Sequence, residues 1–197
     1  GMITSNPYDG ERLAGTVGYA LPGIRVRVAD DTGNELPRGE AGVLEITGPN
    51  VFQGYWQMPD KTAEEFRSDG WFITGDIAVM ADDGRVTIVG RAKDLIISGG
   101  FNVYPKEIES AIDDLPGIKE SAVFGIPHPD FGEAVTAVVV PDGSAELSEP
   151  SVVAALKDRL ARFKQPKRVF IVDALPRNTM GKVQKNILRD TYRDIFT

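Results

Sequence analysis

The sequence predicts an α+β protein that begins with a small antiparallel β-barrel and continues as a compact α+β domain. Short strand signals separated by turn formers fill residues 1–92. Helical periodicity alternates with strand signals over residues 93–197. Between these parts, residues 90–109 join a charged cluster, a Gly-Gly pair and a helix start. We therefore place the domain boundary between residues 92 and 93.

The first domain shows the periodicity of short strands. Segments that alternate in polarity or are rich in β-branched residues are 25–29, 42–48 and 85–90. Asp82-Asp83-Gly84 lies between two apolar runs and predicts a hairpin. One helix is expected near Thr62. Strands this short and this closely spaced favour a small barrel or sandwich.

The second domain is expected to contain about three strands and three helices. The strand signals cover residues 121–126, 134–140 and 168–172. The first helix starts at Pro105, the second covers residues 149–162, and the third begins at Lys182. Apolar residues at helical spacing give these helices a buried face, which indicates one compact core.

The composition excludes several classes of function. A net charge of −7 disfavours non-specific binding to nucleic acid or to an anionic membrane. The absence of cysteine excludes thiolate metal sites and disulfides, and a single histidine, His128, makes a multi-histidine metal site untenable. With no signal-peptide pattern and no long apolar run, we expect a cytoplasmic protein without a membrane span.

Asp76 and Arg91 are the candidate polar residues of the first domain. Asp76 ends the aromatic, strand-like run that starts at Phe72, where a carboxylate can accept hydrogen bonds from a ribose diol. The alternative is a turn aspartate that bonds to its own backbone. Arg91 ends the hairpin strand and, taken alone, is a surface arginine.

Lys182 and the basic run 162–168 are the candidate cations of the second domain. Lys182 follows a glycine at a helix start, so its ammonium and free N–H groups could meet an anion. The loop is not a Walker loop, because Pro176 and Val183 occupy positions where that motif needs glycine and Ser or Thr. The alternative for Lys182, and for Lys164 within the basic run, is a solvated surface lysine.

Four motifs in chain order resemble the adenylate-forming superfamily, which contains acyl-CoA synthetases, peptide-synthetase adenylation domains and firefly luciferase. The motifs are Gly42-Val-Leu-Glu-Ile-Thr-Gly-Pro-Asn-Val-Phe-Gln-Gly-Tyr55, Trp71-Phe-Ile-Thr-Gly-Asp76, the stretch 90–109, and Pro176-Arg-Asn-Thr-Met-Gly-Lys182. The head, residues 1–12, and Gly99-Gly-Phe-Asn-Val-Tyr-Pro-Lys-Glu-Ile-Glu109 look most like malonyl-CoA synthetases.

The resemblance implies an acid–thiol ligase that uses ATP and coenzyme A. In this superfamily a carboxylate attacks the α-phosphate of ATP to form an acyl-adenylate, and the CoA thiol then displaces AMP. The small C-terminal domain rotates between these half-reactions. The implied product here is malonyl-CoA or methylmalonyl-CoA, and the ligands of the Mg²⁺ that accompanies ATP are expected outside this chain.

By the same resemblance, Asp76 and Arg91 are expected to bind the ribose of the nucleotide. Lys93 matches the hinge about which the domain turns.

Lys182 matches the catalytic lysine that bridges the substrate carboxylate and the α-phosphate, where a cation offsets developing charge. Gly100 matches the glycine beside the pantetheine tunnel, where a side chain would obstruct the thiol. Lys164 is assigned to the CoA phosphates on its charge. No metal-ligating residue is assigned.

The superfamily's phosphate-binding loop and most of its acyl pocket have no counterpart in these residues. We therefore expect a C-terminal fragment, inactive alone, whose partners are the upstream domain of the same protein, a small carboxylate, ATP and CoA. A protein acyltransferase or deacylase acting on Lys182 is a further expected partner. The rival interpretations are another acyl- or aryl-CoA synthetase, and a non-catalytic binding or regulatory module.

Overall fold

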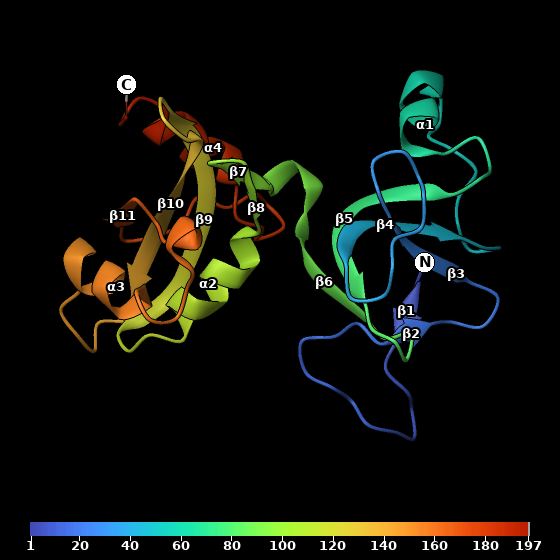
Figure 1. Ribbon diagram of the computed structural model, residues 1–197, viewed down its shortest axis with the longest axis horizontal. Coiled ribbons are helices and arrows are strands. Elements are labelled where there is room, and N and C mark those ends of the chain that lie inside the picture. The colour runs from blue at the N-terminus through green and yellow to red at the C-terminus, as the bar shows by residue number, and fades with distance from the viewer. Residues whose placement is uncertain (197) are drawn as a thin grey trace. The chain divides into compact units, whose positions relative to one another are not determined.

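The protein is seen in a computed structural model that describes residues 1–196 (Figure 1). The chain divides into two compact units: the first is Gly1–Lys93, and the second begins at Asp94. Each unit has its own sheet and its own hydrophobic core. The α+β class predicted from the sequence is confirmed.

The first unit contains an open four-stranded antiparallel sheet in the order β3-β4-β5-β6. Its strands are β3 (Arg25–Ala29), β4 (Ala41–Thr47), β5 (Phe72–Met80) and β6 (Val86–Arg91). The predicted barrel is wrong, because the edge strands β3 and β6 do not pair with each other within residues 1–196 and the sheet stays open. Four strands are too few to close around a filled interior, for which about eight are typical.

Shorter elements complete the first unit. A two-stranded ladder joins β1 (Thr4–Ser5) to β2 (Tyr19–Ala20), and α1 (Pro59–Glu65) is the helix expected near Thr62. The predicted hairpin joins β5 to β6, where the Ala81 N–H donates to the Arg85 carbonyl. The core lies on one side of the sheet and is formed by Val28, Leu44, Ile46, Ala78, Met80 and Val86.

The second unit is built on a mixed five-stranded sheet. Its strands are β7 (Ile96–Ser98), β8 (Phe101–Val103), β9 (Ile118–His128), β10 (Gly132–Pro141) and β11 (Arg168–Ile171). The central strand β10 pairs antiparallel with β9 and β7, and parallel with β11. The strands predicted at 121–126, 134–140 and 168–172 correspond to β9, β10 and β11, whereas β8 was missed, since a three-residue strand is too short to show alternation.

Within residues 92–196, three helices and two 3₁₀ turns accompany these strands. The helices are α2 (Pro105–Asp113), α3 (Glu149–Leu156) and α4 (Lys185–Tyr192), and the 3₁₀ turns are η1 (Ala92–Asp94) and η2 (Arg162–Lys164). Helix α3 ends six residues before the predicted end at 162, where η2 begins. Helix α4 starts at Lys185, so the expectation that Lys182 begins this helix is wrong.

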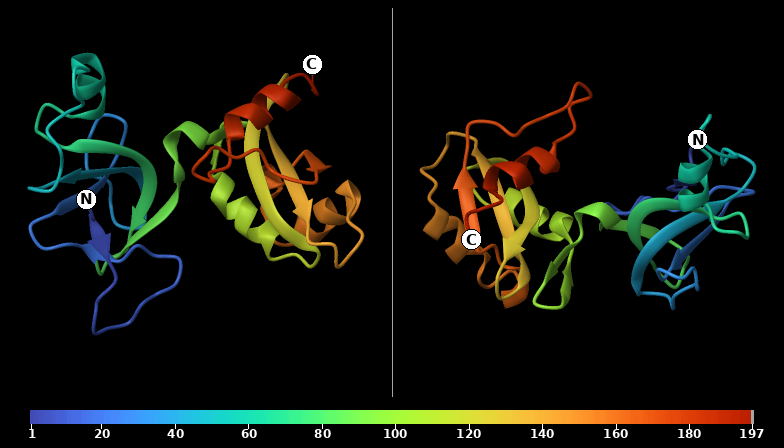
Figure 2. Two further views of the ribbon diagram at one scale, coloured as in Figure 1. Left: turned by 180° about the vertical axis from the view of Figure 1, so that it is seen from behind. Right: turned by 90° about the horizontal axis from the view of Figure 1, so that it is seen from above.

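Each face of the second sheet has its own core. Alternate residues of β10 point to opposite sides, so that Val135 belongs to one cluster and Val138 to the other. The first cluster includes residues of α2 and α3, and the second includes Leu188 of α4. Accordingly α2 lies in front of the sheet in Figure 1, and α4 lies in front in the reversed view of Figure 2.

Candidate functional site

Asp76 and Arg91 face each other on two paired strands. Arg91 is the last residue of β6, but Asp76 lies in the middle of β5 rather than at the end of a strand, as the sequence had indicated. The two are register partners in the β5–β6 ladder, and Arg91 Nε lies 2.8 Å from Asp76 Oδ1. The Asp76 side chain is 25% exposed and that of Arg91 is 54% exposed, so this ion pair is open to solvent on one side. The structure thus brings together the two residues predicted to bind the nucleotide ribose.

A bulge in β5 places Asp76. Val43 pairs with Ile77 and Glu45 pairs with Ile73, so three residues of β5 stand opposite Leu44 alone. Within the bulge, Gly75 has a φ of +72°, a conformation that glycine adopts without strain. Thr74 supports it: its hydroxyl donates to the Leu44 carbonyl at 2.8 Å and accepts the Asp76 N–H at 3.1 Å.

The environment of Asp76 suits a ligand that donates hydrogen bonds. Burial raises the pKa of the Asp76 carboxyl above its ordinary value of 3.8, and the positive charge of Arg91 partly opposes this rise. The charged form is therefore stabilised less than it would be in water. Two hydroxyl donors would offset that deficit, which is what a ribose diol supplies.

Lys93 and Asp94 form the junction of the two units. Both belong to η1, and Lys93 is exposed. Asp94 is fixed to the second unit, because Arg189 Nη2 of α4 lies 2.7 Å from its Oδ1. The predicted hinge residue therefore lies next to an anchored one.

Gly99 and Gly100 form the tight turn between β7 and β8. Both have positive φ, +58° and +81°. A Cβ added to Gly100 would meet no atom within 4 Å, so the turn needs glycine here for its backbone conformation and leaves free space beside it.

Lys164 is already paired with a carboxylate. Its Nζ lies 2.7 and 2.8 Å from the two oxygens of Glu107 on α2. The neighbouring Phe163 stacks on the exposed Phe101 of β8, with ring centroids 4.6 Å apart. Lys164 therefore lies near the Gly100 turn, but Glu107 reduces the charge that it can offer to an anion.

Lys182 lies at the end of a tight hairpin between the bridge partners Arg177 and Val183. Its side chain is exposed, and no ion pair in residues 1–196 involves its Nζ. The Lys182 ammonium could therefore approach an anionic ligand without first breaking a salt bridge.

The two candidate lysines of the second unit border opposite faces of its sheet. Phe163, next to Lys164, packs against the cluster that includes α2 and α3. Val183, next to Lys182, packs against the cluster that includes α4.

Three residues that matter in this geometry were not found by sequence reasoning. Glu107 was interpreted only as a charge at a helix start, and Arg189 gave no signal because 95 residues separate it from Asp94. Asn178 had a usable signal, since Asn followed three residues later by glycine is typical of a hairpin turn.

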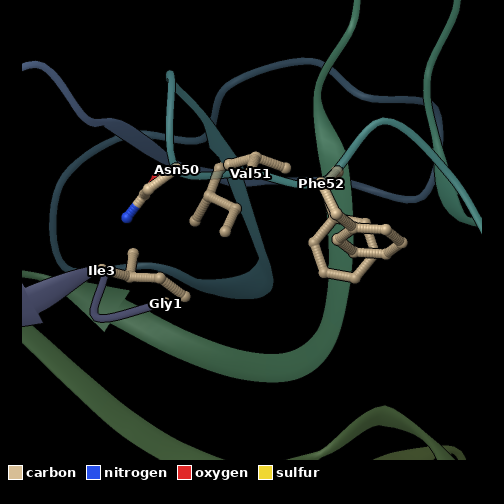
Figure 3. Close-up of a pocket in the computed structure, with 7 residues that line it drawn as sticks. Gly1, Ile3, Asn50, Val51 and Phe52 are labelled. Atoms are coloured by element: carbon tan, nitrogen blue, oxygen red, sulfur yellow. The ribbon is translucent and has the colours of Figure 1, made fainter.

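Other potential sites are limited. Among residues 1–196, no group of three or more His, Asp or Glu side chains is placed to hold a metal ion. No helix in the same range is long and apolar enough to cross a membrane. A pocket of about 120 Å³ in the first unit, lined in part by Ile3, Val51 and Phe52, is too small for a nucleotide (Figure 3).

Two family descriptions match the chain. Residues 1–56 match "AMP-binding enzyme", and residues 107–182 match "AMP-binding enzyme C-terminal domain". The second segment contains Glu107, Lys164 and Lys182.

Named relatives extend the similarity over nearly the whole chain. A long-chain-fatty-acid–CoA ligase of Escherichia coli O6:H1 is 42% identical over 98% of this chain. MatB from Rhodopseudomonas palustris, in a crystal structure with ATP bound, is 62% identical over 100% of this chain with a TM-score of 0.95. The amide bond synthetase McbA from Marinactinospora thermotolerans is 35% identical over 91% of it, with a TM-score of 0.85. The chain spans only 34% of the E. coli relative, 39% of the MatB chain and 36% of the McbA chain.

Proposed function

Because the chain belongs to the family of AMP-binding enzymes, we propose that it forms the C-terminal part of an ATP-dependent acyl-CoA synthetase. The observation that carries this proposal is the 42% identity over 98% of this chain with a protein named as a CoA ligase. Since the chain spans about a third of that relative, the activity belongs to a longer protein in this proposal.

The first half-reaction joins the carboxylate of the acid to the α-phosphate of ATP, and pyrophosphate leaves. We assign Asp76 and Arg91 to the ribose of the nucleotide, because their open ion pair offers a carboxylate acceptor and a cationic donor side by side. We assign Lys182 to the reacting oxygens. Its unpaired ammonium would offset the charge that develops as the two anions meet.

The second half-reaction transfers the acyl group from AMP to the sulfur of CoA. We assign the Gly100 turn to the path of the thiol, because open space lies beside a residue with no side chain. Lys164 is assigned to the CoA phosphates, for which it must exchange its contact with Glu107. ATP would bring Mg²⁺, and we assign no residue of this chain to it.

The position of the two lysines supports a change of domain orientation between these steps. Lys182 and Lys164 border opposite faces of one sheet. If both serve one active centre, the second unit must turn after adenylation, and Lys93 at the junction is the proposed pivot.

We propose malonate or methylmalonate as the acid. This choice rests on the resemblance of residues 1–12 and 99–109 to malonyl-CoA synthetases. It is also in keeping with the higher identity to MatB, 62%, than to the long-chain-fatty-acid ligase, 42%. Another acyl- or aryl-CoA synthetase is the second candidate, because CoA ligases of diverse acids match the chain. Modification of Lys182 by an acyltransferase and a cytoplasmic location stay predictions.

The full-length protein that contains this chain would test the function. It would be incubated with ATP, CoA and either malonate, methylmalonate, a long-chain fatty acid or an aromatic acid. We expect the highest kcat/KM with malonate or methylmalonate. A higher value with a fatty or aromatic acid would overturn the choice of acid, and no acyl-adenylate with any acid would overturn the synthetase assignment.

Two further preparations separate the rivals. Residues 1–197 alone should form no malonyl-CoA above a control without enzyme. In the full-length protein, Lys182→Ala should abolish adenylate formation; if adenylation persisted at the normal rate, a non-catalytic module would be the better description.

A further inference from the structure

Asn178 forms hydrogen bonds with both the backbone N–H and the backbone carbonyl of Lys182. The Asn178 N–H donates to the Lys182 carbonyl at 2.9 Å, and the Asn178 side-chain oxygen accepts the Lys182 N–H, also at 2.9 Å. The same side-chain oxygen accepts the Met180 N–H at 3.0 Å. One asparagine therefore closes the loop and fixes the residue at its end.

The rest of the loop depends on the same asparagine. The Gly181 N–H donates to the Asn178 carbonyl at 2.9 Å, and Gly181 takes a φ of +78°. This is the pattern of a three-residue hairpin loop, a type I turn followed by a glycine in the left-handed region. Met180 at its tip is 77% exposed, so packing contributes little to the loop's shape.

An arginine ties this loop to the body of the second unit. Arg177 Nη1 donates to the Gly181 carbonyl at 2.6 Å, and Arg177 also forms an ion pair with Glu120 of β9. The loop is thus anchored at Arg177 and shaped at Asn178.

The side chain of Lys182 has no comparable support. It is exposed, and no ion pair within residues 1–196 involves its ammonium. The backbone bonds to Asn178 therefore fix the point and the Cα–Cβ direction from which the flexible Lys182 side chain extends.

We propose that Asn178 is a positioning residue for adenylation: it orients Lys182 toward the reacting oxygens through the loop backbone. This inference rests on the proposed function of Lys182. Loss of the side-chain oxygen frees two N–H groups and lets the loop relax. A displacement of about 1 Å at a reacting cation can cost on the order of a hundredfold in rate.

The test compares four variants of the full-length protein in separated half-reactions. Adenylation would be followed by ATP–pyrophosphate exchange, and thioester formation by reaction of a preformed acyl-adenylate with CoA. For Asn178→Ala we expect the kcat of adenylation to fall about tenfold to a hundredfold with little change in the KM for ATP. The thioester step should be unchanged, because Lys182 borders the other face of the sheet.

Rescue and control variants distinguish positioning from general damage. Asn178→Thr keeps a short side chain that accepts a hydrogen bond in a similar turn, and should recover part of the lost rate. Thr179→Ala changes the same exposed loop without removing a hydrogen bond that shapes it, and should behave as wild type. Lys182→Ala provides the reference for complete loss of adenylation.

Each outcome decides between the alternatives. Normal adenylation by Asn178→Ala, together with inactive Lys182→Ala, would overturn the inference and leave the proposed function standing. Equal losses in both half-reactions, or Asn178→Thr no better than Asn178→Ala, would also overturn it. Normal adenylation by Lys182→Ala would overturn the proposed role of Lys182 and the inference together.

Discussion

Arg189 Nη2 lies 2.7 Å from Asp94 Oδ1, so an ion pair joins α4 to the residue that begins the second unit. The two side chains are 30% and 17% exposed. In contrast, Arg193 and Asp190 form a pair of the same length whose side chains are 63% and 65% exposed. The first pair is long-range and largely buried, whereas the second is a local i,i+3 pair that is exposed.

We predict that Arg189→Gln destabilises the second unit by about 1 kcal/mol, because it leaves a largely buried carboxylate without its partner. Arg193→Gln should change stability by less than about 0.5 kcal/mol, since exposed pairs contribute little. Hydrogen exchange of the β10 amides under native conditions reports on this unit alone. Equal effects of the two substitutions would show that burial of the Asp94 pair has no energetic consequence.

Lys93→Pro tests the pivot. Proline fixes φ near −65° and would hinder a change of torsion at the junction, while Asp94 beyond it stays anchored by Arg189. We expect one half-reaction of the full-length protein to be impaired at least tenfold more than the other. Rates measured separately for the two half-reactions provide the readout. Equal losses in both would mean that the domain does not turn at Lys93.

Asp76→Asn should separate function from stability. In the full-length protein we expect the KM for ATP to rise about tenfold or more, because the amide is a weaker acceptor for ribose hydroxyls than the carboxylate. The side chain of Thr87, on the neighbouring strand β6, supplies a control substitution, Thr87→Ser, which should leave this KM unchanged.

The same substitution should alter how stability depends on pH. Because burial raises the pKa of Asp76, the folded state holds this proton more tightly than the unfolded state does. Stability is then lost as the pH rises from the unfolded pKa, near 3.8, through the folded pKa. Asp76→Asn should remove this loss and make the first unit slightly more stable at pH 7 than wild type, with little difference at pH 3.5. Urea unfolding followed by the fluorescence of Trp56 and Trp71 would measure it; a less stable variant at pH 7 would contradict the direction of the shift.

Glu107→Gln tests whether Lys164 serves CoA. Removal of the Glu107 charge frees the Lys164 ammonium and takes a negative charge away from an anionic ligand. We expect the KM for CoA to fall several-fold, and Lys164→Ala to raise it. Glu149→Gln, which removes an equal charge from an ion pair with Arg168, is the control and should have no effect. No response of this KM to either Glu107→Gln or Lys164→Ala would remove Lys164 from the CoA site.

Local patterns allowed correct predictions where one segment carries the whole signal. The strand at 25–29 matches β3 residue for residue, and the Asp82–Gly84 turn joins β5 to β6 as expected. The closed barrel was wrong because closure depends on whether two distant edge strands meet, which no local pattern encodes. Strand β8 was missed because three residues cannot establish a period.

By itself, the sequence determined the superfamily and the chemical types of its candidate residues: a carboxylate in a strand-like run, a Gly-Gly pair, and a lysine that follows a glycine. Only the tertiary structure decided which of the charged side chains form ion pairs. Lys164 is paired with Glu107 across 57 residues and Asp94 with Arg189 across 95, whereas Lys182 is unpaired within residues 1–196. The reason is physical: local propensity acts over a few residues, while ion pairing depends on which surfaces the packed sheet and helices bring together.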